Sequence, residues 1–408
     1  MSSDKSSTLR FTGHRFLVQR LVLSTLTGRP IRISQIRSSS PTSPGLLPHE
    51  VSLLRLLESL TNGTVIEFSY TGTTVVYRPG IITGSAANLG ASSGGAITHE
   101  IPNTCAHGVS YFILPLCLLA PFSKAPFNIL FTGPGVITSA TSHGDISVDS
   151  MRTAILPLYE HFGISGNIEL RILRRSNPGH GGRGGGGEVQ LVFGRQVRLP
   201  KTLHLLNPGR VKRVRGVAYA TGLGGANNAR MIDSARGVLN PLVPDTYIFS
   251  DVSAAPLLPV EGKATGKSGQ QVKRKVGVGF GLSLVAESSI NGVLYSADMA
   301  SPSEGGETPE DVGQKCAFQL LEMIELGGCA STIGAPTMLI LMAMGSEDVG
   351  RLQLGRNVVG SDEVVGLARD LKTFGASGWG LRDASSGTDD VIVSIVGKGI
   401  GNVGSKIA

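Results

Sequence analysis

The chain has 408 residues, of which 41% are hydrophobic and 16% are charged. This balance excludes a disordered chain and suits one large domain with an insertion, or roughly two to three ordinary domains. The longest apolar stretch, residues 111–122, is too short to span a bilayer. The four cysteines form no C-x-x-C pair, which argues against a zinc site or a disulfide framework, so we expect a soluble intracellular protein.

The net charge is +7, and the positive residues are clustered along the chain. Residues 171–215 contain eleven Lys and Arg residues against one acid, Glu188, and the first 40 residues contain seven against Asp4. A clustered excess of this kind favours an anionic partner, of which nucleic acid is the commonest, over a charge that serves solubility alone.

Residues 48–61 repeat Leu and Val at helical spacing and predict a helix. Two strands are expected next, at 64–70 and 73–78, joined by a hairpin turn at Thr71-Gly72. A second unit follows, for which the pattern predicts a helix at 107–119, a strand at 127–132, a helix at 148–162, and strands at 166–173 and 188–193.

A third unit begins at Thr308, which is expected to cap a helix because Pro309 suits its first turn and Asp311 completes a capping box. Beyond this helix we expect a strand at 337–344, a helix at 364–374 and a strand at 390–396. The recurring alternation predicts an α+β fold of repeated units, with helices on one face of each sheet. The different character of residues 205–303 predicts a smaller inserted domain between a first part, 1–204, and a last part, 304–408.

Three short motifs carry little weight on their own. Residues 262–268 are one residue short of a phosphate-binding loop and follow no strand, so we expect a solvated loop. The Gly-rich run 181–187 fits either a close approach to a phosphate or a flexible surface loop. His143-Gly-Asp145 offers a base or a metal ligand, but a single His and Asp without other ligands are more typical of a turn.

Several segments together resemble the RNA 3'-terminal phosphate cyclase family, and some are similar to its eukaryotic cyclase-like branch in particular. Their order and spacing extend over nearly the whole chain. The family segments are Thr27-Gly-Arg-Pro-Ile31, Pro44-Gly-Leu-Leu47, Tyr77-Arg-Pro-Gly80, Arg174-Arg-Ser-Asn-Pro178, Gly185-Gly-Gly-Glu-Val189 and Gln319-Leu-Leu-Glu322. Those of the branch are Leu53-Leu-Arg-Leu-Leu-Glu-Ser59, Tyr70-Thr-Gly-Thr-Thr74, Leu119-Ala-Pro-Phe-Ser-Lys124 and Arg230-Met-Ile-Asp233.

The resemblance implies repeated units of a four-stranded sheet covered by two helices, with a smaller inserted α/β domain. Active members of the family convert a terminal RNA phosphate to a cyclic phosphodiester, using ATP and a covalently adenylylated histidine. In this chain the position of that nucleophile falls on Glu363, and no histidine follows His204. The resemblance therefore implies a cyclase-like protein with no catalytic residue, no cofactor and no metal.

Positive side chains remain where the family holds phosphates. By resemblance, the residues on or beside loops that face the family's groove are Arg15, Arg37, Arg174 and Arg175. We expect them to hold an anion, either RNA backbone or an acidic segment of a partner. Two further basic clusters are expected either to touch RNA or to direct nuclear import; they are Lys212, Arg213 and Arg215, and Lys273, Arg274 and Lys275.

By the same resemblance, we expect a non-catalytic ribosome biogenesis factor in the nucleus, and within it the nucleolus. Its expected role is precursor rRNA processing toward small-subunit rRNA in the small-subunit processome. There it would be a monomer that binds a ribosome-assembly GTPase and RNA, and no membrane. Two alternatives stay open: an endonuclease that cleaves precursor rRNA with His143 and Asp145, and a residual cyclase with another nucleophile such as Lys315.

Overall fold

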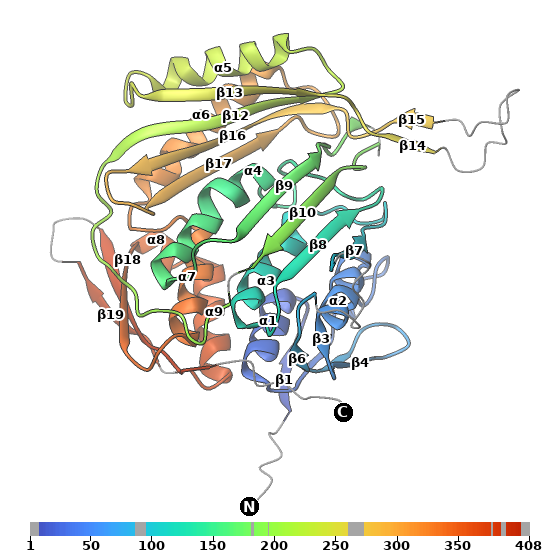
Figure 1. Ribbon diagram of the computed structural model, residues 1–408, viewed down its shortest axis with the longest axis vertical. Coiled ribbons are helices and arrows are strands. Elements are labelled where there is room, and N and C mark those ends of the chain that lie inside the picture. Colours follow the sequence, from blue (N-terminus) through green and yellow to red (C-terminus); the bar gives the residue numbers. More distant parts are fainter. Residues whose placement is uncertain are drawn as a thin grey trace, which may run out of the picture.

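The computed structural model describes residues 8–85, 95–180, 183–194, 196–259, 273–376, 378–384 and 389–400. Within these residues the strands form four four-stranded sheets and two short strand pairs (Figure 1). Helices and sheets occur together in each part of the chain, so the predicted α+β class is confirmed. The loop expected at 262–268 lies outside the described residues.

The first sheet has the order β1-β2-β5-β4, in which β1 and β2 are parallel and the other neighbours antiparallel. The helix predicted over 48–61 and the hairpin after it are confirmed as α2 and as β4 with β5. The elements are β1 (Leu9–Thr12), α1 (Leu17–Thr27), β2 (Ile31–Ser34), α2 (Pro48–Leu60), β4 (Val65–Phe68) and β5 (Val75–Arg78), with the short pair β3 (Thr61–Asn62) and β6 (Ile81–Ile82) beside them.

The second sheet has the order β7-β8-β10-β9. Residues 148–162 are helical as predicted, but they change from an α-turn to a π-turn and then a 3₁₀ turn. The second of these changes, at Leu156, comes directly before Pro157, which has no N–H to donate to the helical ladder. The elements are β7 (Ile97–Glu100), α3 (Ser110–Leu119), β8 (Phe127–Thr132), α4 (Val148–Ser150), η2 (Met151–Ile155), η3 (Leu156–Phe162), β9 (Ile168–Arg174) and β10 (Glu188–Phe193).

The inserted sheet has the order β13-β12-β16-β17, and α5 and α6 cover one of its faces. The predicted capping box of α6 is confirmed, because Thr308 Oγ1 accepts from the Asp311 N–H (3.2 Å) and Asp311 accepts from the Thr308 N–H (3.0 Å). The elements are β12 (Val211–Thr221), α5 (Ala226–Leu239), β13 (Thr246–Ser253), β16 (Gly279–Ser288), β17 (Leu294–Ala300) and α6 (Pro309–Glu325), with a projecting ribbon of β14 (Leu257–Pro259) and β15 (Lys273–Lys275).

Helix α6 belongs by its contacts to the inserted sheet. Its buried Cys316 donates to the main-chain oxygens of Leu282 (3.5 Å) and Ala297 (3.6 Å), which lie on β16 and β17. The boundary predicted between the inserted domain, 205–303, and the last part, 304–408, therefore separates this sheet from α6, one of the two helices that cover it. The sequence pattern alone does not reveal this, because an amphipathic helix carries no mark of which sheet it covers.

The last sheet has the order β11-β18-β20-β19. The strand predicted at 337–344 is wrong, because these residues lie in helix α7. All of them are buried, so no polar face shows the helical period, and a short apolar run of this kind reads equally as a buried strand. The elements are β11 (His204–Leu205), α7 (Gly334–Met344), β18 (Val349–Gly355), α8 (Arg356–Val359), α9 (Asp362–Thr373), β19 (Gly380–Asp383) and β20 (Asp390–Val396).

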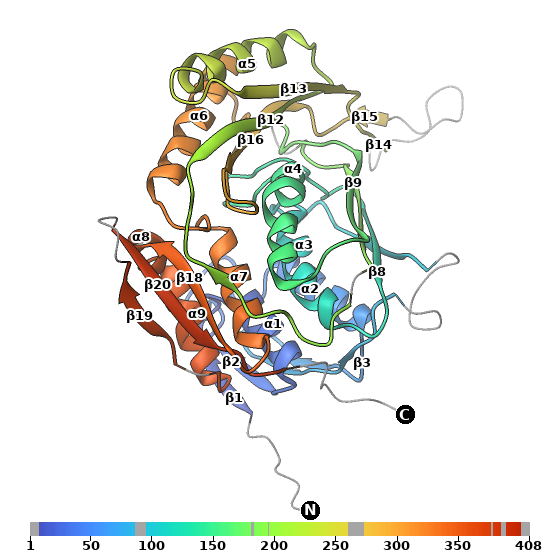
Figure 2. The same ribbon diagram turned by 60° about the vertical axis from the view of Figure 1, so that its left-hand side comes forward.

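Helices from three of the units meet in the middle of the molecule. Helix α1 contacts α3 and α9, and α7 contacts α3 and α9. Figure 2 shows the second and the last sheet on opposite sides of these helices. Their apolar side chains join one continuous hydrophobic core, which fixes the starts of α1 and α9 next to one another. Among the described residues, no helix is long and apolar enough to cross a membrane.

Candidate functional site

The position at which the resemblance places the nucleophile, Glu363, lies at the first turn of α9, opposite the start of α1. Glu363 is exposed there, one residue after Asp362, in a helix that Ser361 caps. Across from it, Phe16 adopts a left-handed backbone conformation (φ 61°), and its ring lies against Gly366. A Cβ at Gly366 would come within 2.4 Å of the Phe16 ring, so the aromatic ring fills the space beside this turn.

Arg15 lies beside the first turn of α9, but its charge is matched. Its guanidinium pairs with Asp362 at 2.5 Å, and both side chains are exposed to solvent. One helical turn below, Arg20 lies over the Phe11 ring (4.5 Å to the centroid) and pairs with Asp370 (3.1 Å). Burial raises the pKa of Asp370, although Arg20 opposes this shift. These contacts tie α1 to α9 and leave two carboxylates at the N-terminus of α9.

Arg37 holds the loop that leads into α2. Its guanidinium makes two hydrogen bonds to the buried Glu50 (2.7 and 2.8 Å) and one to the Gly45 main-chain oxygen (3.0 Å). Glu50 also accepts from the Leu47 N–H (2.8 Å), where it completes the N-terminus of α2. A buried, bidentate pair of this kind is structural, and it leaves Arg37 little positive charge for an outside anion.

Three histidines stack beside Glu50, and we call His49, His107 and His143 the histidine stack. The ring centroids of His49 and His107 are 4.2 Å apart, and those of His107 and His143 are 4.8 Å apart. Tyr111 of α3 packs against His107 with a centroid distance of 4.7 Å. His107 Nδ1 lies 3.0 Å from the Asp145 carboxylate, which fixes the orientation of this ring.

The Asp145 carboxylate is held by three hydrogen bonds. Besides His107, it accepts from Thr141 Oγ1 (2.6 Å) and from the Gly108 N–H (2.8 Å). Burial acts to raise the pKa of Asp145, but these hydrogen bonds outweigh burial and leave the pKa lowered. Burial lowers the pKa of His49 to about 4, and the neighbouring His107 lowers it further in the same direction. Asp145 is therefore charged and His49 is neutral at neutral pH.

The turn predicted at His143-Gly-Asp145 is confirmed, since the Thr141 N–H donates to the Asp145 oxygen (3.2 Å) and Gly144 has a positive φ of 84°. Sequence reasoning missed the other members of the stack. His49 lies in the first turn of α2 and His107 precedes α3, so neither has a local spacing that connects it with His143. Only the packing of the first unit against the second brings them together.

A cavity of about 860 Å³ lies beside His143. Its walls include Thr141 and Ser142, the glycines of two loops, and Arg274 from the β14–β15 ribbon. From residue 183 on, the Gly-rich run packs closely against other main chain, because a Cβ at Gly185 would lie 1.9 Å from the Pro134 oxygen. Its glycines thus serve close backbone approach within the protein; Gly181 and Gly182 lie outside the described residues.

In the described ranges, no three His, Cys, Asp or Glu side chains converge in a way that could hold a metal ion. The rings of the histidine stack are tilted against one another, by 57° between His49 and His107 and by 32° between His107 and His143, and the Asp145 carboxylate contacts the middle ring. Such an arrangement suits proton transfer or stacking better than coordination, which needs ring nitrogens that point at a common centre.

Five arginines of 171–215 form ion pairs, most of them with acids from outside this segment. Arg175 is buried between Asp149 (2.6 Å) and Asp251 (2.5 Å). Burial opposes the charge of Arg175, but the hydrogen bonds with these two carboxylates keep its pKa raised. The more exposed pairs are Arg174 with Glu188 (3.0 Å), Arg213 with Glu287 (2.7 Å) and Arg215 with Asp245 (2.9 Å). These pairs reduce, but do not remove, the excess of positive charge that the segment presents.

Four of the predicted binding residues present charge without an ion-pair partner among the described residues. Lys212 is exposed on β12, and Lys273, Arg274 and Lys275 make up the exposed strand β15. Figure 1 shows the β14–β15 ribbon projecting from one end of the inserted sheet. The structure thus separates the predicted cations into one isolated residue, one projecting cluster and six that are matched by carboxylates.

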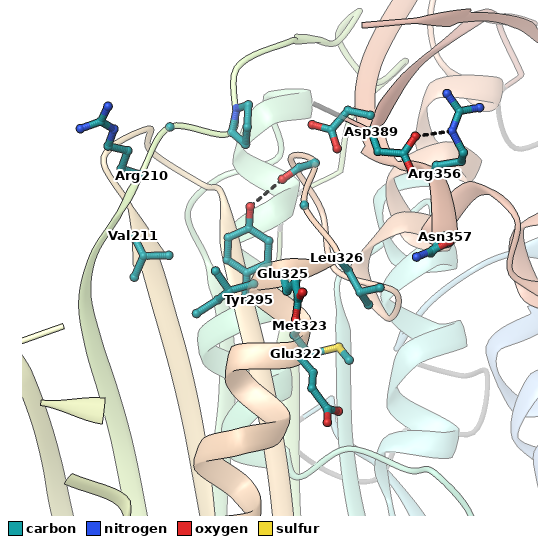
Figure 3. A pocket seen from close by; sticks show the side chains of 16 residues that line it. Arg210, Val211, Tyr295, Glu322, Met323, Glu325, Leu326, Arg356, Asn357 and Asp389 are labelled. Carbon is teal, nitrogen blue, oxygen red and sulfur yellow. Dashed lines mark hydrogen bonds and ion pairs between the residues drawn. The ribbon is translucent and has the colours of Figure 1, made fainter. Parts of the chain in front are cut away.

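A second hollow, of about 940 Å³, lies between the C-terminal end of α6, residues 208–211 and the last sheet (Figure 3). Tyr295 closes one side by donating to the Gly328 oxygen (2.6 Å), and Arg356 on the other side pairs with Asp389 (2.5 Å). Glu322 and Glu325 also line it. Its described lining contains acids and bases in mixture and none of the positions predicted from the sequence.

Comparison with known proteins supports the resemblance independently. A family model described as RNA 3'-terminal phosphate cyclase matches residues 9–368. The rRNA processing protein rcl1 of Schizosaccharomyces pombe is 40% identical over 399 residues, which cover 98% of each chain. The RNA 3'-terminal phosphate cyclase-like protein of Mus musculus is 38% identical over 415 residues, 99% of this chain and 100% of that protein. The rRNA processing protein RCL1 of Saccharomyces cerevisiae is 37% identical over 409 residues, 100% of both.

The family match includes Glu363 and both sides of the histidine stack. The relatives align with the chain from end to end, so the inserted sheet and the last sheet are included as well. By this match, and by the four-stranded units that the structure shows, the chain belongs to the RNA 3'-terminal phosphate cyclase family.

Proposed function

We propose that this chain is a non-catalytic factor in rRNA processing. The observation that carries the proposal is that no histidine follows His204, and that the resemblance places Glu363 at the position of the nucleophile. A carboxylate cannot replace the nitrogen that is adenylylated in the cyclase reaction. Beside the Asp362–Arg15 ion pair, Glu363 also adds a negative charge where the phosphates of ATP would have to approach, and this charge repels them.

The role in rRNA processing is transferred from relatives. Those of Schizosaccharomyces pombe and Saccharomyces cerevisiae are named rRNA processing proteins. We extend the proposal to maturation of small-subunit rRNA within the small-subunit processome, in the nucleolus, as a monomer bound to a ribosome-assembly GTPase. The unpaired cations of β15 support a contact with precursor rRNA in addition.

Depletion tests the role in rRNA processing. The protein is removed from cells that make it, and precursor and mature rRNAs are measured after complementation with the wild type or with Glu363→Gln. We expect small-subunit rRNA to fall on depletion and both versions to restore it, because Glu363 has no chemical role. Normal small-subunit rRNA after depletion would reject the proposal, and failure of Glu363→Gln alone would reject its non-catalytic part.

The RNA contact is tested by its salt dependence. Each lost phosphate contact lowers the slope of log K against log salt by about 0.7 for single strands. Replacement of Lys273, Arg274 and Lys275 by Gln should therefore lower the slope by about 2 on a single-stranded precursor rRNA fragment. The matched control replaces Arg171, Arg174 and Arg213, which are paired with Glu169, Glu188 and Glu287. Equal losses in both variants would contradict a specific role of β15.

An endonuclease is the second candidate, and the histidine stack is what favours it. Asp145 orients His107 in the way that a carboxylate orients a general base, and His143 lies against the same ring. Purified protein is incubated with precursor rRNA in the presence of a chelator. Cleavage that disappears in His107→Gln and in Asp145→Asn would support this function, whereas no cleavage by the wild type would reject it.

A residual cyclase based on Lys315 has less support. Lys315 lies on the exposed side of α6 and pairs with Glu307 at 2.5 Å. The hydrogen bond to Glu307 raises the pKa of Lys315, so the neutral amine that a nucleophile requires is rarer still. A labelled adduct after incubation with radioactive ATP, absent in Lys315→Gln, would establish this activity against our expectation.

A further inference from the structure

The outer strand of the inserted sheet exposes a pair of aromatic side chains. Tyr247 and Phe249 of β13 are 57% and 55% exposed, and their rings pack edge to face with centroids 4.7 Å apart. Ile248 between them is buried on the face that the helices cover, so the two aromatic rings lie on the opposite face. Apolar side chains gathered on an outer strand are a common mark of a binding surface.

The edge of β13 is open for pairing as well. The strand is outermost in its sheet, and Asp245 and Ser253 direct their main-chain oxygens to Val214 and Gly222. In a parallel pair, alternate residues direct both of their main-chain groups to the same neighbour. The main-chain groups of the even-numbered residues from 248 to 252 therefore face away from β12, toward the open edge. They can form a ladder with one added strand.

The same face of β13 continues into a groove. Asp251 and Ser253 line a hollow of about 520 Å³, whose other wall includes Leu173 and Arg174 of β9. Leu173 is 52% exposed, and β9 is the outermost strand of the second sheet. Figure 1 shows the end of β9 near the end of β13 that leads into β14. An extended chain that follows β13 would pass from the aromatic pair into this groove.

The charges around this path favour a peptide over RNA. Arg152 and Arg175 contact Asp149, Arg174 contacts Glu188, and Arg215 next to Tyr247 contacts Asp245. Each of these cations is already matched by a carboxylate. An RNA bound here would therefore gain little affinity from neutralisation of its phosphates. A peptide needs no such charge, since ladder hydrogen bonds and alternate apolar side chains provide its affinity.

A second copy of the chain fits this edge poorly. In a two-fold antiparallel pairing centred on residue 248, Asp251 faces Asp245, and like charges directly opposite each other destabilise a sheet. Centred on residue 249 or 250, Asp251 faces Tyr247 or Phe249, which places its charge against an aromatic ring. Each of these registers works against self-pairing.

We infer that the open edge of β13 and the adjoining groove bind an extended segment of a partner protein by strand addition. The segment carries apolar side chains at alternate positions, which pack on Tyr247 and Phe249, and its end enters the groove beside Leu173. This inference rests on the proposed role as a binding factor. It is tested separately, because peptide binding is measured on the purified chain and rRNA levels are measured in cells.

The test begins with selection of peptides from a random twelve-residue display library on the full-length protein. Synthetic, fluorescein-labelled versions of the enriched peptides are measured by fluorescence anisotropy. We expect Phe249→Lys to weaken their binding at least tenfold and Leu381→Lys to leave it unchanged. Leu381 is the matched control, because it is 58% exposed on β19, the outermost strand of the last sheet. Phe249→Thr, which keeps a strand-forming residue, should weaken binding in the same direction.

Hydrogen exchange then locates the bound peptide. Strand addition predicts slower exchange of the main-chain N–H groups of Ile248, Ser250 and Val252 in the complex. Equal binding to the wild type and Phe249→Lys, or protection elsewhere only, would overturn the inference. Binding of a labelled ten-residue poly(U) that depends on Phe249 would assign the surface to RNA instead. A wild-type dimer in sedimentation that Phe249→Lys dissociates would assign it to self-pairing.

Discussion

Arg175 and Arg174 are neighbours in the sequence, but their replacement should have very different effects. Arg175 is 9% exposed and makes two hydrogen bonds to Asp149, which is 1% exposed, and its guanidinium also lies over the Tyr219 ring. Arg174 is 47% exposed and pairs with Glu188. Arg175→Met would leave the Asp149 carboxylate buried with its main partner gone, whereas Arg174→Met would leave Glu188 in water.

Loss of one partner from a buried ion pair costs roughly 3–5 kcal/mol. The lower end applies to Arg175→Met, since Arg152 still lies 3.2 Å from Asp149 and Asp251 is 45% exposed to water. We therefore expect a loss of about 3 kcal/mol in the free energy of unfolding. Arg174→Met should cost less than about 1 kcal/mol, as is usual for an exposed pair.

Urea unfolding at pH 7, followed by far-ultraviolet circular dichroism, measures the free energy of unfolding of both variants. High salt should reduce the small effect of Arg174→Met and leave that of Arg175→Met nearly unchanged, because a buried pair is screened little. Adding Asp149→Asn to Arg175→Met should recover part of the loss, since the unpaired charge is then removed. Equal losses from Arg174→Met and Arg175→Met would refute the assignment of Arg175 to a buried structural triad.

Three further variants or titrations test other parts of the structure. Burial raises the pKa of Asp298 in the folded protein above its unfolded value of about 3.8. The stability that this raised pKa contributes is therefore present below pH 3.8 and is lost as the pH rises through the folded pKa. Asp298→Asn should therefore gain stability relative to the wild type from pH 4 to pH 8 in urea unfolding, and the opposite trend would contradict the shift. His49, with a pKa of about 4, should stay neutral down to pH 5 in a nitrogen-15 NMR titration; a midpoint near the ordinary 6.5 would disagree. Gly366→Ala should cost roughly 1–3 kcal/mol by overpacking against Phe16, and Phe16→Ala in the same chain should reduce the additional effect; independent, additive losses would mean that the two residues do not touch.

Much of the secondary structure follows from local sequence patterns. The capping box at Thr308 and the amphipathic helix after it depend on residues close together in the chain, and both are confirmed. The strand predicted at 337–344 failed where the local pattern carries no information, because α7 is buried on every side. Its identity as a helix is fixed by packing against α3, α9 and β20, which are distant in the chain.

The candidate site was predicted less well, for a physical reason. Charge is counted along a sequence but acts through space. Two of the matched arginines of 171–215 pair with carboxylates that the local count does not include, Arg175 with Asp149 and Arg215 with Asp245. The histidine stack has the same origin, since His49 and His107 meet only when α2 and α3 pack. The prediction for Glu363 depends on no packing, because the absence of histidine after His204 is visible in the sequence itself, and it stays a prediction.

Strand β11 has a consequence for the order in which the chain acquires its structure. His204 pairs with Arg351, so the last sheet recruits a strand that emerges from the ribosome before the whole inserted sheet. The inserted sheet is closed by contacts that are much nearer in the chain, between β12, β13, β16, β17 and α6. Local contacts form faster than distant ones, because less chain entropy is lost in closing the loop. During synthesis the inserted sheet should therefore fold first, while β11 stays unpaired until its partner strand β18 has been synthesised.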